Sequence, residues 1–317
     1  MLIPRFWSRA DSQAVTPDGK QVQFHVWRGS RSDPAEADAL AREAVERIAG
    51  RIRRGEGFPE RYSYGDRPLR EEVVRELPGA TEAEPEVAIT RNSYGALVLN
   101  AARVFFIDVD VAPAEAPPSA PAAASPVDAL FDAVDSLPLP GAVKSLFGSF
   151  RPPATPSTPP PAPADPRTAA LERLRGWLGG HPEWRVRVYR THSGLRYAVT
   201  HALFGPTDEE ALKAMSVLGA DPQYVRLCRA QKSFRARLTP KPWRVGIENP
   251  PARFPYETPD DERAMRGWEA RYAQASQRFA TCELLEELGG GTEHPEVVPI
   301  ISLHDEHTRV GSTLPLA

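Results

Sequence analysis

Residues 104–110 read Val-Phe-Phe-Ile-Asp-Val-Asp, an apolar run that ends in two aspartates. Such an uninterrupted apolar run is typical of a strand that is buried on both faces. Residues two apart on a strand point to the same side, so Asp108 and Asp110 are expected to project together from the strand end. Carboxylates held this close repel each other unless a cation or a proton lies between them. The run predicts either a cation site or a solvated turn in which the aspartates accept backbone hydrogen bonds.

The cation interpretation favours Mg²⁺ or Mn²⁺, because hard oxygen ligands suit these ions, especially where a nucleotide phosphate completes the ligand shell. It also makes a prediction about stability. Replacing Asp108 by Asn would remove the repulsion, so the metal-free protein should be equally stable or more stable.

Residues 111–165 contain 14 of the 34 prolines of the chain. A stretch so rich in Pro and Ala forms neither a strand ladder nor a continuous helix, so we expect an extended or disordered linker. Residues 127–150 interrupt it with enough apolar side chains for one or two short amphipathic helices. This island is expected to dock on the domain or on a protein partner.

Composition predicts a protein with reduced cysteine thiols and without a membrane-spanning segment. Its net charge is −3, and Cys228 and Cys282 are far apart in sequence with no metal-type spacing. The N-terminal residues contain no signal peptide, and no stretch of about 18 apolar residues occurs, so no membrane partner is expected. These features predict a cytoplasmic protein.

The remaining pattern predicts an α+β fold. Strands are expected at residues 20–27, 87–90, 96–99, 104–110, 184–189, 197–203 and 233–239. Helices are expected at residues 35–53, 67–77, 167–178, 207–218 and 221–230, and one or two more within residues 259–288. Thr207 and Glu210 match a capping box. The strands of residues 86–110 are expected to form an antiparallel meander that places the acidic strand in the middle of a sheet.

Basic residues gather in the second half of the chain. Residues 185–244 hold twelve basic and four acidic residues, with aromatic side chains at Tyr224, Phe234 and Trp243. This segment predicts a face that binds phosphoanions or nucleic acid, with a solvated helix face and exposed strand arginines as the alternative. The tail, residues 297–317, is expected to hold a short strand. Its His304-Asp305-Glu306-His307 run could bind a metal, but a polar tail is the favoured interpretation.

The order of three segments resembles the catalytic core of the archaeo-eukaryotic primase, or primase-polymerase, superfamily. In that family a strand ends in Asp-x-Asp or Asp-x-Glu, a hairpin carries a Ser-x-His type motif, and a third acidic residue precedes an arginine-bearing strand. Asp108 and Asp110 match the first motif and Ser193-Gly194 the start of the second, while Asp221 is similar to the third. The resemblance covers roughly residues 86–244.

The resemblance implies an RRM-like antiparallel or mixed sheet core with helices on one face, interrupted by the Pro-rich insertion and followed by a C-terminal helical extension. The implied parts are residues 1–110 with the acidic strand, the linker 111–165, the second half of the core at 166–246, and the extension and tail at 247–317. The implied activity is a DNA or RNA primase-polymerase, a nucleotidyltransferase that adds nucleotides to a nucleic-acid 3′ end with two divalent metals, Mg²⁺ or Mn²⁺.

The resemblance also implies roles for single residues. Asp108, Asp110 and Asp221 would be the catalytic metal ligands. The nucleoside triphosphate would contact Ser193, Gly194, Arg196 and Lys241, and the DNA or RNA strand would contact Arg229, Arg235 and Arg237.

One departure from the family leaves two alternatives open. The family's histidine is expected just after the serine, where this chain has Leu195-Arg196-Tyr197. Arg196 could contact the triphosphate in its place. The alternatives are a catalytically inactive nucleic-acid-binding or nucleotide-binding protein of the same fold, and an interaction scaffold that uses residues 127–150.

Overall fold

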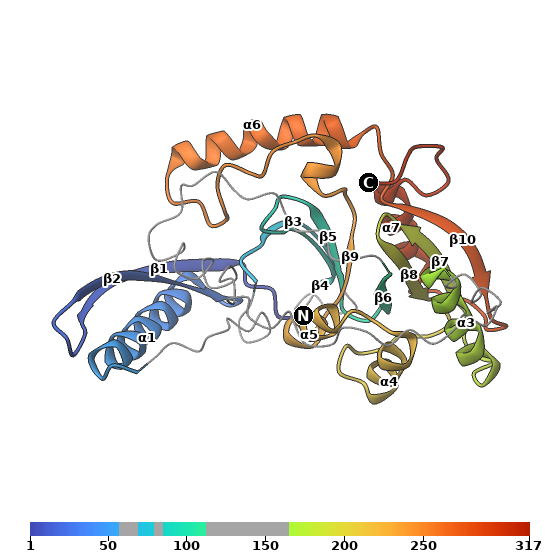
Figure 1. The fold of residues 1–317 in the computed structure, drawn as a ribbon, viewed down its shortest axis with the longest axis horizontal. Coiled ribbons are helices and arrows are strands. Elements are labelled where there is room, and N and C mark those ends of the chain that lie inside the picture. Colours follow the sequence, from blue (N-terminus) through green and yellow to red (C-terminus); the bar gives the residue numbers. More distant parts are fainter. Residues whose placement is uncertain (57–68, 79–84, 112–164) are drawn as a thin grey trace, which may run out of the picture. The chain divides into compact units, whose positions relative to one another are not determined.

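The computed structural model describes residues 1–56, 69–78, 85–111 and 165–317 (Figure 1). The predicted linker and its island at residues 127–150 therefore lie outside the described residues, apart from the two end positions 111 and 165. The described chain is a mixed α+β fold built on antiparallel sheets, as predicted. Within the described ranges, no helix has the length and apolar character needed to cross a membrane.

The N-terminal hairpin packs against one long helix, visible as the blue elements of Figure 1. Strands β1 (Phe6–Val15) and β2 (Gln21–Ser30) pair antiparallel, and α1 (Pro34–Arg53) follows. Asp33 caps α1 by accepting a hydrogen bond from the Glu36 backbone N–H, and Pro34 occupies the first turn. The predictions for β2 and α1 are confirmed, whereas β1 was not predicted.

The first four-stranded sheet contains β3 (Glu72–Pro78), β4 (Pro85–Arg91), β5 (Leu97–Ala101) and β9 (Phe234–Arg237), in the order β3-β4-β5-β9. The turn between β4 and β5 is closed by Asn92, whose side-chain oxygen accepts hydrogen bonds from the Tyr94 and Ala96 backbones. Gly95 has a φ of +88°, and a Cβ there would lie 2.1 Å from the Trp268 ring, so this turn requires glycine.

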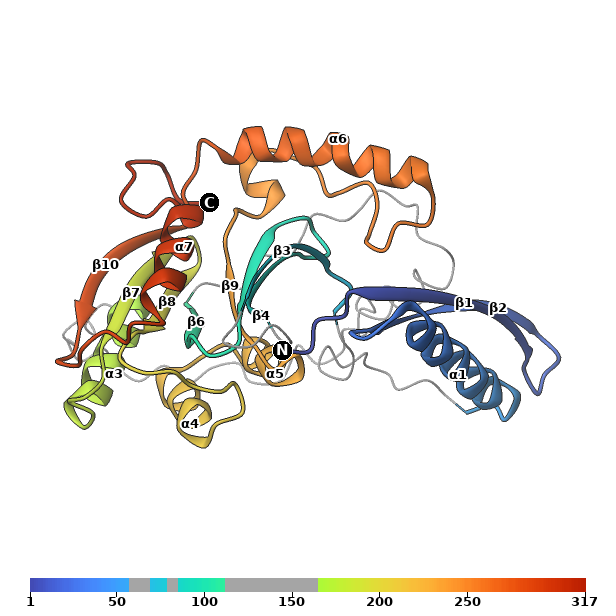
Figure 2. The ribbon, with the colours of Figure 1, turned by 180° about the vertical axis from the view of Figure 1, so that it is seen from behind.

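The second sheet contains β6 (Phe106–Asp110), β7 (Val186–Thr191), β8 (Gly194–Val199) and β10 (Cys282–Leu288). Its order is β10-β7-β8-β6, so the acidic strand lies at an edge of this sheet (Figure 2). The predicted meander is therefore wrong at its last step. Strand β5 pairs with β4 on one side and with β9 on the other, and β6 pairs with β8 in the other sheet.

One large apolar core contacts both sheets and the helices that cover them. These helices are α3 (Pro166–Gly179), α4 (Glu209–Leu218), α5 (Pro222–Gln231) and α7 (Val298–Thr308), whereas α6 (Pro259–Ser276) and the short 3₁₀ turn η2 (Pro242–Val245) contribute no buried residue to the described part of this core. Phe105, Trp184 and Phe234 are fully buried in this core. A second cluster around Trp268 and Tyr272 packs α6 against η2.

Four local predictions are wrong. Residues 72–78 form strand β3 instead of part of a helix, because they pair with β4. Residues 282–288 form β10 instead of helix, because they pair with β7. The predicted tail strand is helix α7. The N-cap of α4 is Asp208 and not Thr207, and its side chain makes no capping hydrogen bond to the helix.

The extension at residues 247–317 is therefore only partly helical. It supplies β10 to the second sheet, while residues 166–246 supply β9 to the first sheet. Each sheet thus contains strands from both predicted halves of the core, with β9 at an edge of the first sheet and β6 at an edge of the second.

Candidate functional site

The pairing of β6 with β8 sets the geometry around the two aspartates. Asp108 lies opposite Arg196, and Asp110 lies opposite Gly194. A Cβ on Gly194 would lie 2.0 Å from the carbonyl oxygen of Val109, so the close approach of the two strands requires glycine there. Gly194 is buried between these strands, so a larger side chain there would have no room.

Asp108 is held by a bidentate ion pair with Arg196. The Arg196 Nε lies 2.7 Å from Oδ1 of Asp108, and Nη2 lies 3.1 Å from Oδ2. The Arg196 side chain is 1% exposed and that of Asp108 is 32% exposed. Burial alone would lower the pKa of Arg196, but Asp108 raises it, and the net shift is upward. Both oxygens of Asp108 are thus already engaged by an internal cation.

Asp221 joins this region through the backbone of β6. Its N–H donates to the Asp108 carbonyl oxygen at 3.1 Å, while its carboxylate caps α5 by accepting from the Gln223 and Tyr224 backbones at 3.0 and 3.2 Å. The Tyr224 hydroxyl donates to the Phe106 carbonyl oxygen at 2.5 Å. The start of α5 is therefore fixed along the outer edge of β6.

Asp110 lies at the exposed end of β6, among charges of both signs. Its pKa is raised, first by partial burial of the carboxylate and then by the negative charges of Asp108 and Asp221. Arg237 and Lys241 act in the opposite direction. The structure thus brings the three predicted carboxylates close enough to interact, with two basic side chains beside them.

The basic side chains near Asp110 have different surroundings. Arg237 is half-buried, and its Nε has no hydrogen-bond partner among the described residues. The Nζ of Lys241 lies 5.4 Å from the centre of the Trp243 ring. Ser193 accepts a hydrogen bond from Arg244 at 2.7 Å, which brings one more cation to the β7–β8 turn. A buried donor without an acceptor is a position where an anionic ligand atom would be stabilised.

Two of the predicted nucleic-acid contacts lie elsewhere. Arg235 is 8% exposed, and its guanidinium donates to Glu71 and Asn100, at 2.7 Å in each case, within the first sheet. It therefore does not present its charge on a basic face. Arg229 lies exposed in the last turn of α5, a position open to solvent.

A dedicated metal centre is not visible in the described part of the chain. Among those residues, no group of three His, Cys, Asp or Glu side chains is arranged to hold an ion. The His304-Asp305-Glu306-His307 run is also not the polar tail that was favoured. His304 is fully buried on α7, where its ring lies 5.2 Å from that of Phe106.

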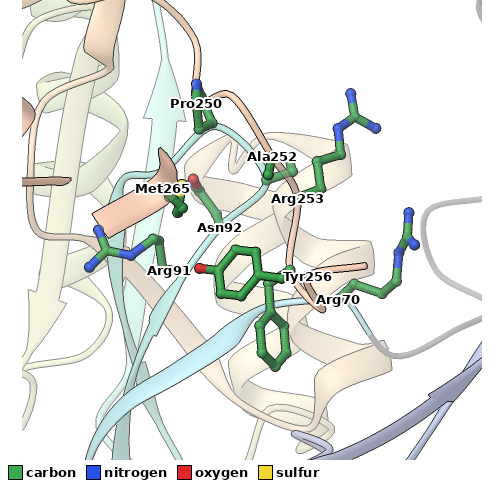
Figure 3. A pocket seen from close by; sticks show the side chains of 10 residues that line it. Arg70, Arg91, Asn92, Pro250, Ala252, Arg253, Tyr256 and Met265 are labelled. Atoms are coloured by element: carbon green, nitrogen blue, oxygen red, sulfur yellow. The ribbon is translucent and has the colours of Figure 1, made fainter. Parts of the chain in front are cut away.

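A separate small pocket, with a cavity volume of about 10 Å³, lies between the β4–β5 turn and the segment before α6 (Figure 3). Figure 3 shows Arg70 and Arg253 on one side of Tyr256 and Arg91 on the other. The charge of Arg91 is balanced by Glu72 and Glu269, whose oxygens lie 3.5 and 3.1 Å from its Nε. The pocket includes none of the predicted site residues.

Sequence reasoning missed His304 and Arg244. The signal for His304 was present, because Val297, Ile300, Ile301, His304 and Thr308 recur at helical spacing and all are buried. Arg244 carried no separate signal, since it was one of many basic residues in its segment.

Comparison of the chain with protein-family models, with curated proteins and with solved structures finds no match.

Proposed function

We propose that the chain is a primase-polymerase-like nucleotidyltransferase that binds a nucleoside triphosphate beside Asp110 and adds the nucleotide to a nucleic-acid 3′ end. One observation supports this proposal above the others. The carboxylates of Asp108 and Asp221 and the cations of Arg237 and Lys241 all act on Asp110. Transfer of a phosphoryl-type group depends mainly on positioning and on balancing charge, so these side chains suit the reaction.

In this proposal the basic side chains bind the phosphates. The unsatisfied Nε of Arg237 supplies a buried donor, and Lys241 supplies a second positive charge. Ser193 and Arg244, hydrogen-bonded to each other, extend the phosphate site to the β7–β8 turn. Arg196 has a different role from the one the resemblance implies, because its guanidinium fixes Asp108.

The donor set suits a hard divalent ion only in part. Asp110 and Asp221 would hold Mg²⁺ or Mn²⁺, and the raised pKa of Asp110, caused by burial and then by Asp108 and Asp221, reflects a repulsion that a cation would relieve. Asp108 would join them only on leaving Arg196. When bound, such an ion neutralises charge on the phosphates.

The finer structural expectations accompany this proposal. They are an RRM-like core made of the two four-stranded sheets, a Pro-rich insertion after β6 that recruits a protein partner through residues 127–150, and a cytoplasmic location where nucleic acid and nucleotides meet.

A second candidate function is nucleotide or nucleic-acid binding without transfer. The bidentate pair of Arg196 with Asp108 favours it, because it occupies both oxygens of the first carboxylate. Arg196, which stands near the position of the family's histidine, thereby makes the Asp108 carboxylate unavailable to a metal ion.

The test measures two properties of the same protein. Primer extension is followed with Mg²⁺ and with Mn²⁺, and nucleotide binding is followed by titration, for the wild type, Asp110→Asn and Arg237→Gln. Asp260→Asn is the matched control, since Asp260 is an exposed residue on α6. Extension that is lost in Asp110→Asn supports the transferase. Binding that weakens in Arg237→Gln, without any extension, supports the second candidate, and the absence of both properties contradicts both.

A further inference from the structure

A buried polar chain leads from Asp108 to helix α7. The Nη1 of Arg196 lies 2.9 Å from the carbonyl oxygen of Arg237 and 3.2 Å from Nε2 of His304. The other ring nitrogen, Nδ1, lies 2.8 Å from Oδ1 of Asp305. Asp305 also lies 3.0 Å from Nη1 of Arg187 on β7.

The chemistry of these groups fixes the proton on His304. A guanidinium only donates hydrogen bonds, so Nε2 must accept from Arg196 with its lone pair. The remaining nitrogen, Nδ1, then carries the proton, and its N–H donates a hydrogen bond to Asp305. The ring is therefore neutral and present as the Nδ1–H tautomer.

The surroundings of His304 agree with a neutral ring. It is fully buried between the rings of Phe106 and Tyr189, whose centres lie 5.2 and 5.0 Å away. The pKa of His304 is lowered to about 4: burial is the largest cause and Arg196 also lowers it, while Asp305 and Asp108 oppose the shift. The thiol of Cys282 on β10 lies 3.9 Å from Nε2, and its pKa is raised to about 11 by burial, so it is also neutral.

We infer that His304 is a positioning residue, which accepts a hydrogen bond from Arg196 through Nε2 and so holds the guanidinium flat against Asp108. Arg196 makes two contacts to Asp108, through Nε and Nη2, while its Nη1 contacts the Arg237 carbonyl, His304 and, at 3.6 Å, the sulfur of Cys282. The Asp108 carboxylate is one-third exposed, and the two side-chain hydrogen bonds that it accepts both come from Arg196. Its orientation is therefore set from inside the protein, and Asp305 sets the orientation of His304 in turn.

This inference rests on the proposed function only in its last consequence, the effect on nucleotide binding at the same site. The contact between His304 and Arg196 is testable without any nucleotide, so the two ideas can fail separately.

The experiment uses two substitutions of His304, each of which can keep the hydrogen bond made by one of the two ring nitrogens. In His304→Gln the amide can place an oxygen where Nε2 was, and the acceptor for Arg196 remains. In His304→Asn the amide lies near the former Nδ1, so the contact with Asp305 can persist while Arg196 loses its acceptor. His304→Leu removes both contacts.

The primary readout is nuclear magnetic resonance of the full chain with labelled arginine and histidine. In the wild type at neutral pH we expect the Nδ1–H tautomer of His304 and a slowly exchanging Nη1–H of Arg196, the proton that His304 accepts. We expect His304→Asn to speed exchange of that proton by about tenfold, the loss expected for one hydrogen bond to a charged group. In His304→Gln the exchange should stay close to that of the wild type.

Three outcomes would overturn the inference. They are a cationic or Nε2-protonated His304 in the wild type, equal exchange of the Arg196 proton in the Asn and Gln variants, and no change in either variant. Failure of His304→Leu to fold leaves the Asn and Gln comparison intact. Nucleotide titration of the same variants then shows separately whether the orientation of Asp108 matters for the proposed site.

Discussion

The Asp110 carboxylate is less stable as a charged group in the folded chain than in the unfolded chain. Burial, Asp108 and Asp221 raise its pKa above the ordinary value of 3.8. The folded state therefore binds this proton more tightly, so the associated stability is present below pH 3.8 and is lost as the pH rises through the folded pKa.

We expect Asp110→Asn to stabilise the metal-free protein at pH 7 by roughly 0.5 kcal/mol, within the range for an exposed position. The gain should vanish near pH 3, where the wild-type carboxyl is protonated in both states. Urea unfolding at the two pH values measures this, with Asp260→Asn as the exposed control. If the variant is less stable than the wild type at pH 7, the charged Asp110 carboxylate is not destabilised by burial and by Asp108 and Asp221.

Asp108→Asn should have the opposite effect, because its partner Arg196 is 1% exposed. The variant leaves that guanidinium buried without the carboxylate that pairs with it. We expect a loss of about 2–3 kcal/mol, somewhat below the value for fully buried pairs because Asp108 is partly exposed. Urea unfolding at pH 7 measures the loss, and adding Arg196→Met should restore part of it.

The structure thereby reverses the stability expectation drawn from sequence for Asp108. That expectation used only the spacing of two aspartates, which correctly places both on one side of a strand. It could not include the neighbour across the sheet, because the register of β6 against β8 is a tertiary property. The same limit applies to Arg235, whose partner Glu71 is 164 residues away in sequence.

At the scale of elements, the first sheet carries a buried polar network that joins three of its strands to the residue before β3. Glu71 and Asn100 accept hydrogen bonds from Arg235, and both also contact the hydroxyl of Thr90. These four side chains are each less than a tenth exposed. The network is satisfied within the sheet, so it fixes the register of β4, β5 and β9.

We expect Arg235→Met alone to destabilise the protein by about 3–5 kcal/mol, because it leaves the Glu71 carboxylate buried without its cation. The double variant Glu71→Met with Arg235→Met should recover much of that loss. Arg229→Met, at an exposed position of α5, is the control and should change stability by less than about 0.5 kcal/mol. Equal losses in the single and double variants would show that Glu71 does not depend on Arg235.

Local sequence patterns predicted most helices and the central strands, yet they failed where two periods fit equally well. Residues 282–288 have apolar side chains at spacings that suit a strand or a helix. Pairing with β7 decides for the strand, and ion pairs such as Arg190 with Glu283 line that pairing. Helix α7 was missed because its polar His304 contacts the buried Arg196 and its Asp305 pairs with the partly buried Arg187, instead of both facing solvent.

At the scale of the whole chain, the β1–β2–α1 unit has its own small apolar clusters. One contains Ala14, Ala49 and Ile52, and the other contains Val26, Ala44 and Val45. These clusters are separate from the large core. Polar contacts such as Arg5 with Glu76 at 2.7 Å and Arg9 with Glu257 at 2.6 Å link the unit to later segments.

We expect this unit to open without global unfolding, since its apolar side chains are mostly small. Hydrogen exchange followed by mass spectrometry should show amide protons of β2 and α1 exchanging at least about tenfold faster than those of β7 and β8. Equal protection across these segments would indicate that the polar contacts couple the unit fully to the core.

The position of α5 along β6 has a consequence for what the second sheet can pair with. The carbonyl oxygens of Phe106 and Asp108 that face away from β8 already accept hydrogen bonds from Tyr224 and Asp221. At the opposite edge, the pairing of β10 with β7 is irregular between Leu284 and Glu286. That strand also carries three glutamates, at positions 283, 286 and 287. An incoming peptide or a second copy would meet occupied acceptors at one edge and an irregular acidic strand at the other, so strand addition to this sheet is disfavoured.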